Sequence, residues 1–367
     1  MIYFLVNNDY HFNLDEKLAS NINGHKLGLI QIPYSLKLVS SSTVFDKIIT
    51  FHDKLNTSLK WMLFNFGANR KLLKKIDNEL DVDLNDILLV HTEIDMLNQY
   101  IISKFYNAGA KVFLIEDGTA TMSLFNMTTG KVANKDRIRS LMLKYCYGFS
   151  NFEFKKYGVE TLAQMEDHIF RGLIVKRGDK INRDIPIYKL APFLDQINII
   201  HKNGAIFFSQ GLYLFFMSED EYIKLVDRFL EISNFFSPFY FKFHPSDSEY
   251  VKKKLVGLIE SKYRNVDIIL ENDIAENLIN KYPVGYAITF NSTAVFNILE
   301  KGIVPIFLNK ILNEFFPDDS FVAFGQFLSS INCNVPANIE EINPDFVAFK
   351  DEMQNSNTYK LIDILEL

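Results

Sequence analysis

A chain of 367 residues is too long for a single hydrophobic core, so we predict two domains of about 150 to 200 residues each. Hydrophobic residues make up 48% of the chain and charged residues 23%, which is ordinary for a globular protein and excludes a disordered or fibrous one. The net charge of -6 argues against nucleic acid as a partner, because proteins that coat nucleic acid carry a strong basic excess.

The cysteines, the first residues and the apolar runs bear on the cellular setting. Cys146 and Cys333 lie far apart and lack the spacing of metal ligands, so we predict neither a disulfide framework nor a zinc site and expect a reducing cytoplasm. The segment 1–6 has no basic region and Asn7-Asn8-Asp9 follows at once, which indicates a first strand rather than a signal peptide. No apolar run reaches the roughly 18 residues of a membrane-spanning helix, so any membrane contact is expected to be peripheral.

The first half of the chain alternates apolar runs of strand length with amphipathic stretches, as is typical of a parallel sheet with helices on both faces. After about residue 120 this rhythm gives way to a polar loop at 127–136, a helix near 137–149 and an irregular segment reaching about residue 200, which we interpret as the inter-domain region. The predicted strands are 2–6, 27–32, 60–64, 87–91 and 111–116, and the predicted helices are 14–22, 44–55, 68–79 and 94–107.

From Gly204 the alternation resumes and predicts a second doubly wound unit. We therefore expect an α/β fold with two Rossmann-like doubly wound domains facing a central cleft, the arrangement called GT-B, with ligands at the carboxyl ends of the strands. The expected boundaries are 1–190 and 200–350 for the two domains and 351–367 for a C-terminal tail or helix. The predicted strands are 205–209, 239–243, 266–270, 284–290 and 303–308, and the predicted helices are 219–234, 248–262, 273–281 and 293–301.

The first candidate motif follows the strand at 111–116. Its apolar residues run straight into Glu116, Asp117 and Gly118, with Thr119 next. A carboxylate at the edge of a cleft can accept a proton from an attacking hydroxyl, and partial desolvation raises its pKa toward a useful value. The glycine would let an acceptor approach the backbone. A plainer interpretation stays open, because Asp-Gly also favours a simple turn.

The second candidate motif is His244-Pro245, at the end of the strand 239–243. Proline ends the strand and holds the preceding residue in an extended conformation, so the direction of His244 is defined. A histidine fixed there can bond or protonate a phosphate oxygen. Alternatively the following turn satisfies the imidazole, and one of residues 246–248 caps the next helix.

The third candidate motif is Asn291-Ser292-Thr293, between the strand 284–290 and the helix 293–301. Free N–H groups and the helix dipole make such a junction an anion site, to which the Ser292 and Thr293 hydroxyls can add hydrogen bonds. A capping role for Asn291 or Ser292 is compatible with this function. The sequence therefore predicts a phosphate site here.

Two weaker features accompany these motifs. Gln210-Gly211, after the strand 205–209, is a glycine turn that could border a nucleotide. Glu219 and Asp220 begin the next helix, where acids are favoured by the dipole, although either could face the cleft.

The order of these motifs resembles that of bacterial GT-B sialyltransferases, the group of lipooligosaccharide sialyltransferases and capsular polysialyltransferases. Those families carry a (D/E)-(D/E)-G motif, an HP motif and an S-(S/T) motif, which Glu116-Asp117-Gly118, His244-Pro245 and Ser292-Thr293 match in order. The resemblance spans most of the chain but rests on these few positions, and it does not single out one subfamily.

The resemblance implies inverting transfer of sialic acid from CMP-sialic acid to a glycan hydroxyl. Asp117 would be the general base, oriented by Glu116, and His244 the acid or phosphate partner. Some lipooligosaccharide-type relatives place an extra carboxylate shortly before the HP motif, so Asp220 is a second candidate for the base. Gly118 and Thr119 would lie on the acceptor side. The residues expected to bind the CMP-sugar are His244, Pro245, Ser292, Thr293, Asn291, Gln210 and Gly211.

No cofactor or metal is expected, because the single charge on the CMP leaving group can be held by a histidine and a helix N-terminus without Mg²⁺. Two basic clusters in the first half would suit an anionic membrane surface or a lipid-linked acceptor, although a solvated helix face is the simpler explanation for each cluster taken alone. The clusters are Arg70, Lys71, Lys74 and Lys75, and Lys131, Lys135, Arg137, Arg139 and Lys144.

The expected acceptor is a galactose hydroxyl of a lipopolysaccharide, lipooligosaccharide or repeat unit, because a processive polysialyltransferase should carry a longer basic track. Linkage and homodimerisation stay open. Two alternatives also stay open: a transferase of the same fold that uses a UDP-hexose or CMP-Kdo, and a non-catalytic glycan-binding assembly subunit.

Overall fold

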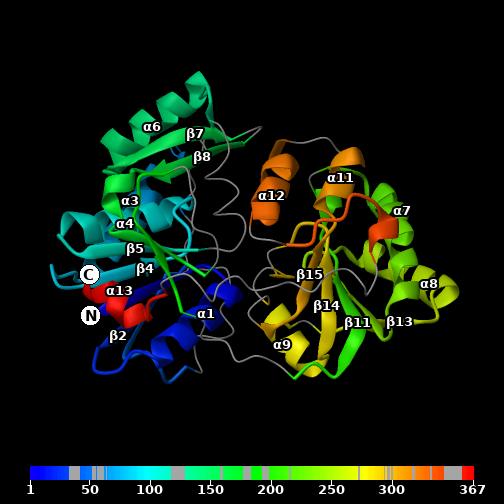
Figure 1. Ribbon diagram of the computed structural model, residues 1–367. Coiled ribbons are helices and arrows are strands. Elements are labelled where there is room, and N and C mark those ends of the chain that lie inside the picture. Colours follow the sequence, from blue (N-terminus) through cyan, green and yellow to red (C-terminus); the bar gives the residue numbers. More distant parts are fainter. Residues whose placement is uncertain are drawn as a thin grey trace. The chain divides into compact units, whose positions relative to one another are not determined.

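The computed structural model contains two compact units (Figure 1). Among the described residues, 1–116, 129–191 and 358–367 form unit 1, and 198–342 form unit 2. No helix in the described part of the chain is both long and apolar enough to span a membrane. The structure describes residues 1–32, 42–51, 55, 62, 64–116, 129–157, 160–176, 183–191, 198–214, 216–271, 273–292, 294–295, 298, 301–315, 319–330, 333–342 and 358–367.

Unit 1 is built on a seven-stranded sheet in which every pair of neighbouring strands is parallel. Its central strands are buried on both faces, which is why they appear in the sequence as continuous apolar runs rather than alternating ones. In spatial order the strands are β10 (Ile187–Lys189), β9 (Gly172–Val175), β5 (Lys111–Ile115), β4 (Ile87–Val90), β1 (Ile2–Val6), β2 (Leu27–Gln31) and β3 (Lys47–Thr50).

Two of the described helices of unit 1 begin at polar residues whose side chains satisfy free backbone N–H groups. The Asn8 side chain accepts from the His11 backbone, and Asp95 accepts from Leu97 and Asn98. The helices are α1 (Asp9–Ser20), α3 (Phe66–Glu79), α4 (Met96–Asn107), α6 (Asn134–Tyr147) and α13 (Leu361–Glu366). The C-terminal tail or helix expected at 351–367 contains α13, which packs on unit 1, where Lys111 Nζ donates to the carbonyl of Leu365 at 3.3 Å.

Two predictions at one edge of this sheet are wrong. The stretch predicted as a helix at 44–55 contains the edge strand β3, in which only Ile49 is buried, so its apolar signal is short. The predicted strand at 60–64 lies mostly outside the described residues, but Met62 and Phe64 are helical. A short apolar run does not distinguish a buried helical turn from a strand.

The segment interpreted as the inter-domain region, from about residue 120 to about 200, contains several strands. Strands β9 and β10 extend the main sheet, and an antiparallel three-stranded sheet precedes them. Its strands are β6 (Thr129–Gly130), β7 (Phe152–Tyr157) and β8 (Glu160–Met165). Figure 1 shows α6 lying against this small sheet, so the predicted helix at 137–149 is confirmed, with its start at Asn134.

Unit 2 contains a five-stranded parallel sheet, and the predicted strands of this half are confirmed. Its order is β13 (Val266–Ile269), β12 (Phe239–Lys242), β11 (His201–Phe208), β14 (Val284–Thr289) and β15 (Val304–Phe307). The helices and short 3-10 turns are η3 (Leu212–Leu214), α7 (Glu219–Leu230), η4 (Glu231–Phe235), α8 (Glu249–Lys262), α9 (Ala275–Lys281), α11 (Asn309–Phe315), α12 (Asp319–Ser330) and η6 (Ile339–Glu341). The predicted helix at 293–301 falls largely outside the described residues.

Phenylalanine fills the core of unit 2. The rings of Phe207 and Phe241 stack at 5.6 Å between centroids, and the ring of Phe290 meets Phe207 and Phe229 edge-on, each at 5.3 Å. These aromatic contacts join the sheet to α7. The prediction of an α/β fold with two Rossmann-like sheets is thus confirmed.

Candidate functional site

The strand order of unit 2 reverses at β11, which lies between β12 and β14. Ligands of open α/β sheets bind beyond the carboxyl ends of the strands at such a switch point. The register places Phe208 beside both Lys242 and Thr289, so the three strands end at the same level. The structure therefore brings the segments 209–211, 243–245 and 290–292 to one edge of one sheet.

A chain of hydrogen bonds joins these three segments. The His244 N–H donates to Ser209 Oγ at 2.9 Å and to Asp247 Oδ2 at 2.8 Å, and Ser209 Oγ donates to the same carboxylate oxygen at 3.1 Å. The next residue, Gln210, accepts from the Asn291 N–H through Oε1 at 2.9 Å. The ends of β12, β11 and β14 are thus fixed with respect to one another.

His244 occupies the first position of a tight turn that Pro245 extends and the Asp247 N–H closes on the His244 carbonyl at 3.0 Å. Its Nδ1 accepts from the Ser246 N–H at 3.2 Å, which places the proton of a neutral ring on Nε2. Burial lowers the pKa of His244, against an opposing effect of the Asp247 carboxylate. At neutral pH the imidazole is therefore an uncharged hydrogen-bond donor.

Asp247 is a site residue that the sequence indicated only as a helix cap. Ser248 caps α8 instead, accepting from the Val251 N–H at 3.2 Å, while the side chain of Asp247 is 4% exposed and turns toward β11. Burial raises its pKa, and its Oδ1 has no hydrogen-bond partner among the described residues. Its partner Ser209 is 38 residues away in sequence, so no local pattern could have revealed this contact.

A cavity of about 450 Å³ opens beside His244, between the ends of β12 and β13 and the first turns of α8. Three lysines line it, including the buried Lys242, whose Nζ donates to the Phe243 carbonyl at 2.7 Å and whose pKa is lowered by burial. The lining residues are Lys242, Phe243, His244, Pro245, Glu249, Lys252, Lys253, Val256, Ile269 and Leu270. The cavity suits an anionic ligand.

The end of β14 carries the third motif. Thr289 Oγ1 donates to the Phe208 carbonyl at 3.0 Å and accepts from the Ser292 N–H at 3.3 Å. Ser292 Oγ accepts from the Ala294 N–H at 3.2 Å, which keeps its own hydroxyl proton for a ligand. The buried Oδ1 of Asn291 has no partner among the described residues, and Thr293 lies outside them.

The weaker sequence candidates divide between the turn and the helices. A Cβ added at Gly211 would lie 3.1 Å from Leu214 Cδ1 and 3.7 Å from Asp247 Oδ1, so the backbone closely approaches the carboxylate. Asp220 is exposed and accepts from the Tyr250 hydroxyl at 2.8 Å, and Glu219 accepts from Ser248 Oγ. The contacts of these two acids are therefore with α8 and its cap.

In unit 1, the acidic motif begins at the end of β5. Glu116 is fully buried, and its Oε2 accepts from the Lys176 N–H, at the end of the neighbouring strand β9, at 2.9 Å. This bond fixes the position at which the chain leaves the sheet. Asp117, Gly118 and Thr119 lie outside the described residues.

Unit 1 has its own switch point between β1 and β4, and a cavity of about 440 Å³ lies there. The guanidinium of Arg139, on α6, lies 4.8 Å from the centre of the Phe154 ring, and burial lowers the pKa of this arginine. The cavity is lined by Asn7, Leu55, Thr92, Ile94, Asp95, Met96, Arg139, Phe154, Leu162 and Ala163. It combines a cation, an apolar wall and several polar groups.

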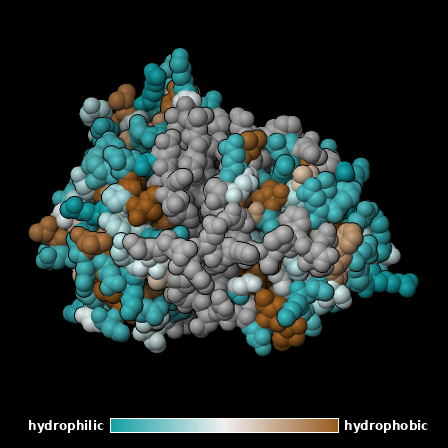
Figure 2. Space-filling model, in the orientation of Figure 1, coloured by the Kyte–Doolittle hydropathy of each residue, from teal (hydrophilic) through white to brown (hydrophobic). Residues whose placement is uncertain are grey.

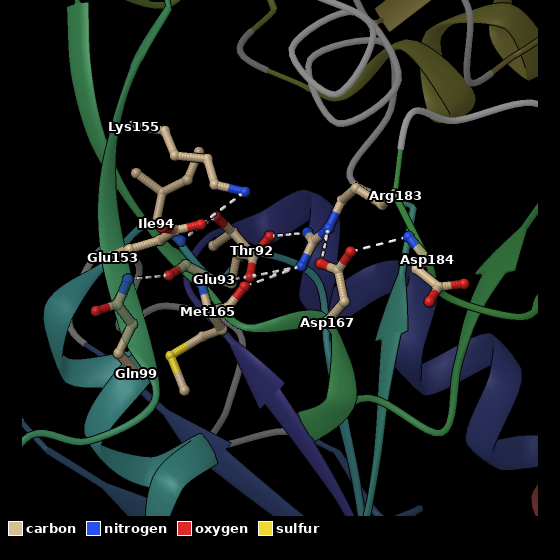
Figure 3. Close-up of polar contacts among 10 residues, drawn as sticks. All are labelled: Thr92, Glu93, Ile94, Gln99, Glu153, Lys155, Met165, Asp167, Arg183 and Asp184. Atoms are coloured by element: carbon tan, nitrogen blue, oxygen red, sulfur yellow. Dashed lines mark hydrogen bonds and ion pairs between the residues drawn. The ribbon is translucent and has the colours of Figure 1, made fainter. Parts of the chain in front are cut away.

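A buried ionic network holds two walls of this cavity together (Figure 3). Glu93 lies between the lining residues of the β4–α4 loop and pairs with Arg183. It also accepts from the N–H of Met165, the last residue of β8, at 2.9 Å. Arg183 also donates to Asp167 Oδ1 at 2.7 Å and to the Met165 carbonyl at 3.1 Å. Figure 3 shows Gln99 beside this network, and its Nε2 donates to the Glu93 carbonyl at 2.7 Å.

Replacing Arg183 with methionine is expected to lower the free energy of unfolding by about 3 to 5 kcal/mol, because the Glu93 carboxylate stays buried without its cation. Burial already raises the pKa of Glu93 and Arg183 opposes that rise, so the variant should raise this pKa further. A group whose folded pKa is raised loses its contribution to stability as pH increases through that pKa. Urea unfolding should therefore show that Arg183→Met loses less free energy of unfolding at acid pH than at neutral pH.

The double variant Glu93→Gln with Arg183→Met is the matched control, because it removes both charges. Its free energy of unfolding should fall by less than that of Arg183→Met alone, and the loss should not show the added pH dependence. Equal losses in the single and the double variant would show that the unpaired carboxylate is not the cause.

Known proteins resemble the chain mainly in fold. No curated protein matches it in sequence. The α/β-galactoside α-2,3-sialyltransferase of Photobacterium phosphoreum shares 11% identity over 93% of this chain and 99% of its own, with a TM-score of 0.50. The glycosyltransferase of kitacinnamycin shares 11% over 100% and 92%, with a TM-score of 0.53. A putative UDP-N-acetylglucosamine 2-epimerase of Listeria monocytogenes shares 9% over 95% and 92%, with a TM-score of 0.52.

At such low identities these structures establish the fold, which is GT-B, and nothing about the ligand. The family comparison is more specific, because the family model for alpha-2,8-polysialyltransferases matches residues 20–300, well over half of the chain. The match includes Glu116, His244 and Ser292, which the sequence had singled out. The protein is therefore a glycosyltransferase of the sialyltransferase class, and it belongs to the alpha-2,8-polysialyltransferase family.

Proposed function

We propose that the enzyme transfers sialic acid from CMP-sialic acid to a hydroxyl of a bacterial surface glycan, with inversion at the anomeric carbon. The observation that carries this proposal is the hydrogen-bond chain that joins Ser209, His244 and Asn291 at the switch point of unit 2. It holds the segments that carry His244-Pro245 and Asn291-Ser292 at the edge where a nucleotide is expected.

In this proposal the phosphate of CMP-sialic acid lies among neutral and cationic hydrogen-bond donors. His244 offers Nε2–H, and Ser292 its hydroxyl proton. Gln210, whose Oε1 is already an acceptor, offers its amide N–H groups. CMP-sialic acid carries a phosphate and a carboxylate, and Lys252 and Lys253 in the adjoining cavity match this second negative charge.

Asp117 is the proposed general base. Glu116, the residue before it in the sequence, is held at the end of β5 by its bond to the Lys176 backbone. The departing CMP takes up a single negative charge, which hydrogen-bond donors can stabilise. We therefore propose that transfer does not require a metal ion, which activity in the presence of EDTA would support.

The cavity of unit 1 is the proposed acceptor site. The sequence favoured a galactose-ended acceptor, but the description of the family and the Arg139 guanidinium in the lining both favour an acceptor that ends in sialic acid. A planar guanidinium binds a carboxylate in two-pronged fashion, whereas a galactose end offers it no charge.

We expect CMP to stabilise the folded protein and UDP to leave it almost unchanged. A ligand present at 100 times its Kd adds about 2.7 kcal/mol to the free energy of unfolding, which thermal denaturation detects readily. CMP-sialic acid should then label a glycan acceptor, and galactose-ended and sialic acid-ended oligosaccharides supplied in parallel distinguish the two acceptor classes.

Stabilisation by UDP but not by CMP would instead favour the UDP-hexose alternative. Stabilisation by CMP without transfer from CMP-sialic acid to either acceptor would direct attention to CMP-Kdo as the donor.

A further inference from the structure

Helix α6 exposes an apolar ridge on the surface of unit 1. Ile138, Leu141 and Tyr145 are 51%, 55% and 80% exposed, and their spacing places them on one side of the helix. The opposite side is buried, through Leu143 and Tyr147 among others. Because the helix already has a buried face, folding of unit 1 does not account for this second apolar one.

Cations flank the ridge. Lys135, Arg137 and Lys144 are all exposed, and the only acidic residue of α6, Asp136, is buried on the other side. The exposed face of this helix is therefore apolar and positive, in a chain whose net charge is -6. Figure 2 shows hydrophobic residues standing among hydrophilic ones in the region that carries α6 in Figure 1.

The start of α3 adjoins α6 and carries the same chemistry. The Tyr147 hydroxyl donates to the Met62 carbonyl at 2.6 Å, and the Tyr147 ring lies 5.2 Å from the ring of Phe66. Phe64 and Phe66 are 75% and 38% exposed, and the Arg70 guanidinium lies 5.2 Å from the Phe66 ring. Apart from Lys131, which precedes α6, the two basic clusters of the sequence thus lie on neighbouring helices of one unit.

We propose that the exposed face of α6 and the start of α3 dock unit 1 on an anionic lipid bilayer. Apolar side chains at the crest of a helix can enter the boundary between headgroups and acyl chains, while flanking cations meet the lipid phosphates. Charge complementarity selects this occupant, because the exposed residues of α6 include cations but no carboxylate. The proposal goes beyond the transfer reaction, which does not depend on it.

Co-sedimentation of the full chain with vesicles tests this docking. The wild type should bind vesicles of phosphatidylcholine and phosphatidylglycerol, and bind phosphatidylcholine alone far more weakly. Replacing Lys135, Arg137 and Lys144 together with glutamine should weaken binding by about 100-fold, since each cation near an anionic surface contributes roughly a factor of five. Replacing Ile138, Leu141 and Tyr145 together with serine should weaken it by about 10-fold or more.

A matched control removes three exposed cations from unit 2, by replacing Lys224, Lys254 and Arg264 with glutamine. This variant should sediment with vesicles as the wild type does. All variants should keep the thermal stability of the wild type and its transfer rate with a soluble acceptor in the absence of vesicles. A variant that loses the transfer rate with a soluble acceptor would bear on the proposed function. A variant that loses only its sedimentation with vesicles would bear on the docking surface.

Three outcomes would overturn the proposal. The first is equal binding of the wild type to both kinds of vesicle, and the second is an equal effect of the α6 and the unit 2 substitutions on binding. The third is a wild type that does not bind vesicles but self-associates in light scattering until the serine substitutions are made, which would identify a second copy of the chain as the occupant.

Discussion

Replacing Asp117 with asparagine is expected to reduce the rate of sialic acid transfer by about 10²- to 10⁴-fold, the usual contribution of a general base. Asparagine keeps the size of the side chain but cannot take a proton from the acceptor hydroxyl. Because the proposed phosphate site lies in unit 2, the stabilisation of the variant by CMP should match that of the wild type. Single-turnover transfer with saturating CMP-sialic acid measures the chemical step.

Asp220→Asn is the control variant for Asp117→Asn. Asp220 was the second candidate for the base, and its contact in the structure is with Tyr250 on α8. We expect the Asp220 variant to retain wild-type turnover. A large loss in Asp220→Asn together with full activity in Asp117→Asn would transfer the role of base to Asp220.

The sequence predicts unit 2 well for a physical reason. Its central strands are buried on both faces, so β14 and the second half of β11 read as nearly continuous apolar runs. The helices α7 and α8 begin at side-chain caps, Ser218 and Ser248. Chemical groups placed directly after such runs are easily located, and this is how His244 and Ser292 were found. Their arrival at one edge follows from the parallel order of the strands.

The sequence fails where strands are short, exposed or at an edge. In β7 (Phe152–Tyr157), phenylalanines mix with charged residues, and β9 has only four residues, so neither stands out among loops. Strand β10 lies at the edge of the sheet and pairs with β9. The small sheet and the two added strands therefore emerge only from long-range pairing.

Site residues that act through tertiary contacts are also invisible in the sequence. Glu93 and Arg183 are 90 positions apart, and their pairing places the walls of the unit 1 cavity. Arg139 appeared in the sequence as one of several surface cations, whereas the structure places it against Phe154 in the cavity lining. Nothing in the local pattern distinguishes it from its exposed neighbour Arg137.

Replacing His244 with glutamine should lower the affinity for a CMP-sialic acid analogue about 10- to 100-fold, the range for one hydrogen bond to a charged group. The variant should also remove a pH dependence. In the free protein burial holds the pKa of His244 below its usual range, whereas a bound phosphodiester favours the imidazolium and raises it. The affinity of the wild type should therefore increase as pH falls below the pKa of His244 in the complex. It should level off once pH is below the pKa of His244 in the free protein.

Calorimetric titration with a non-transferable analogue between about pH 5 and 8 measures this difference, because a phosphodiester does not itself titrate there. Ser209→Ala is the matched control: it removes the Oγ that accepts from the His244 N–H but leaves the imidazole in place. It should weaken binding while keeping the pH dependence. If the affinities of wild type and His244→Gln run parallel across this range, His244 does not contact the phosphate, and the lysine-lined cavity beside it would have to hold the donor without the imidazole.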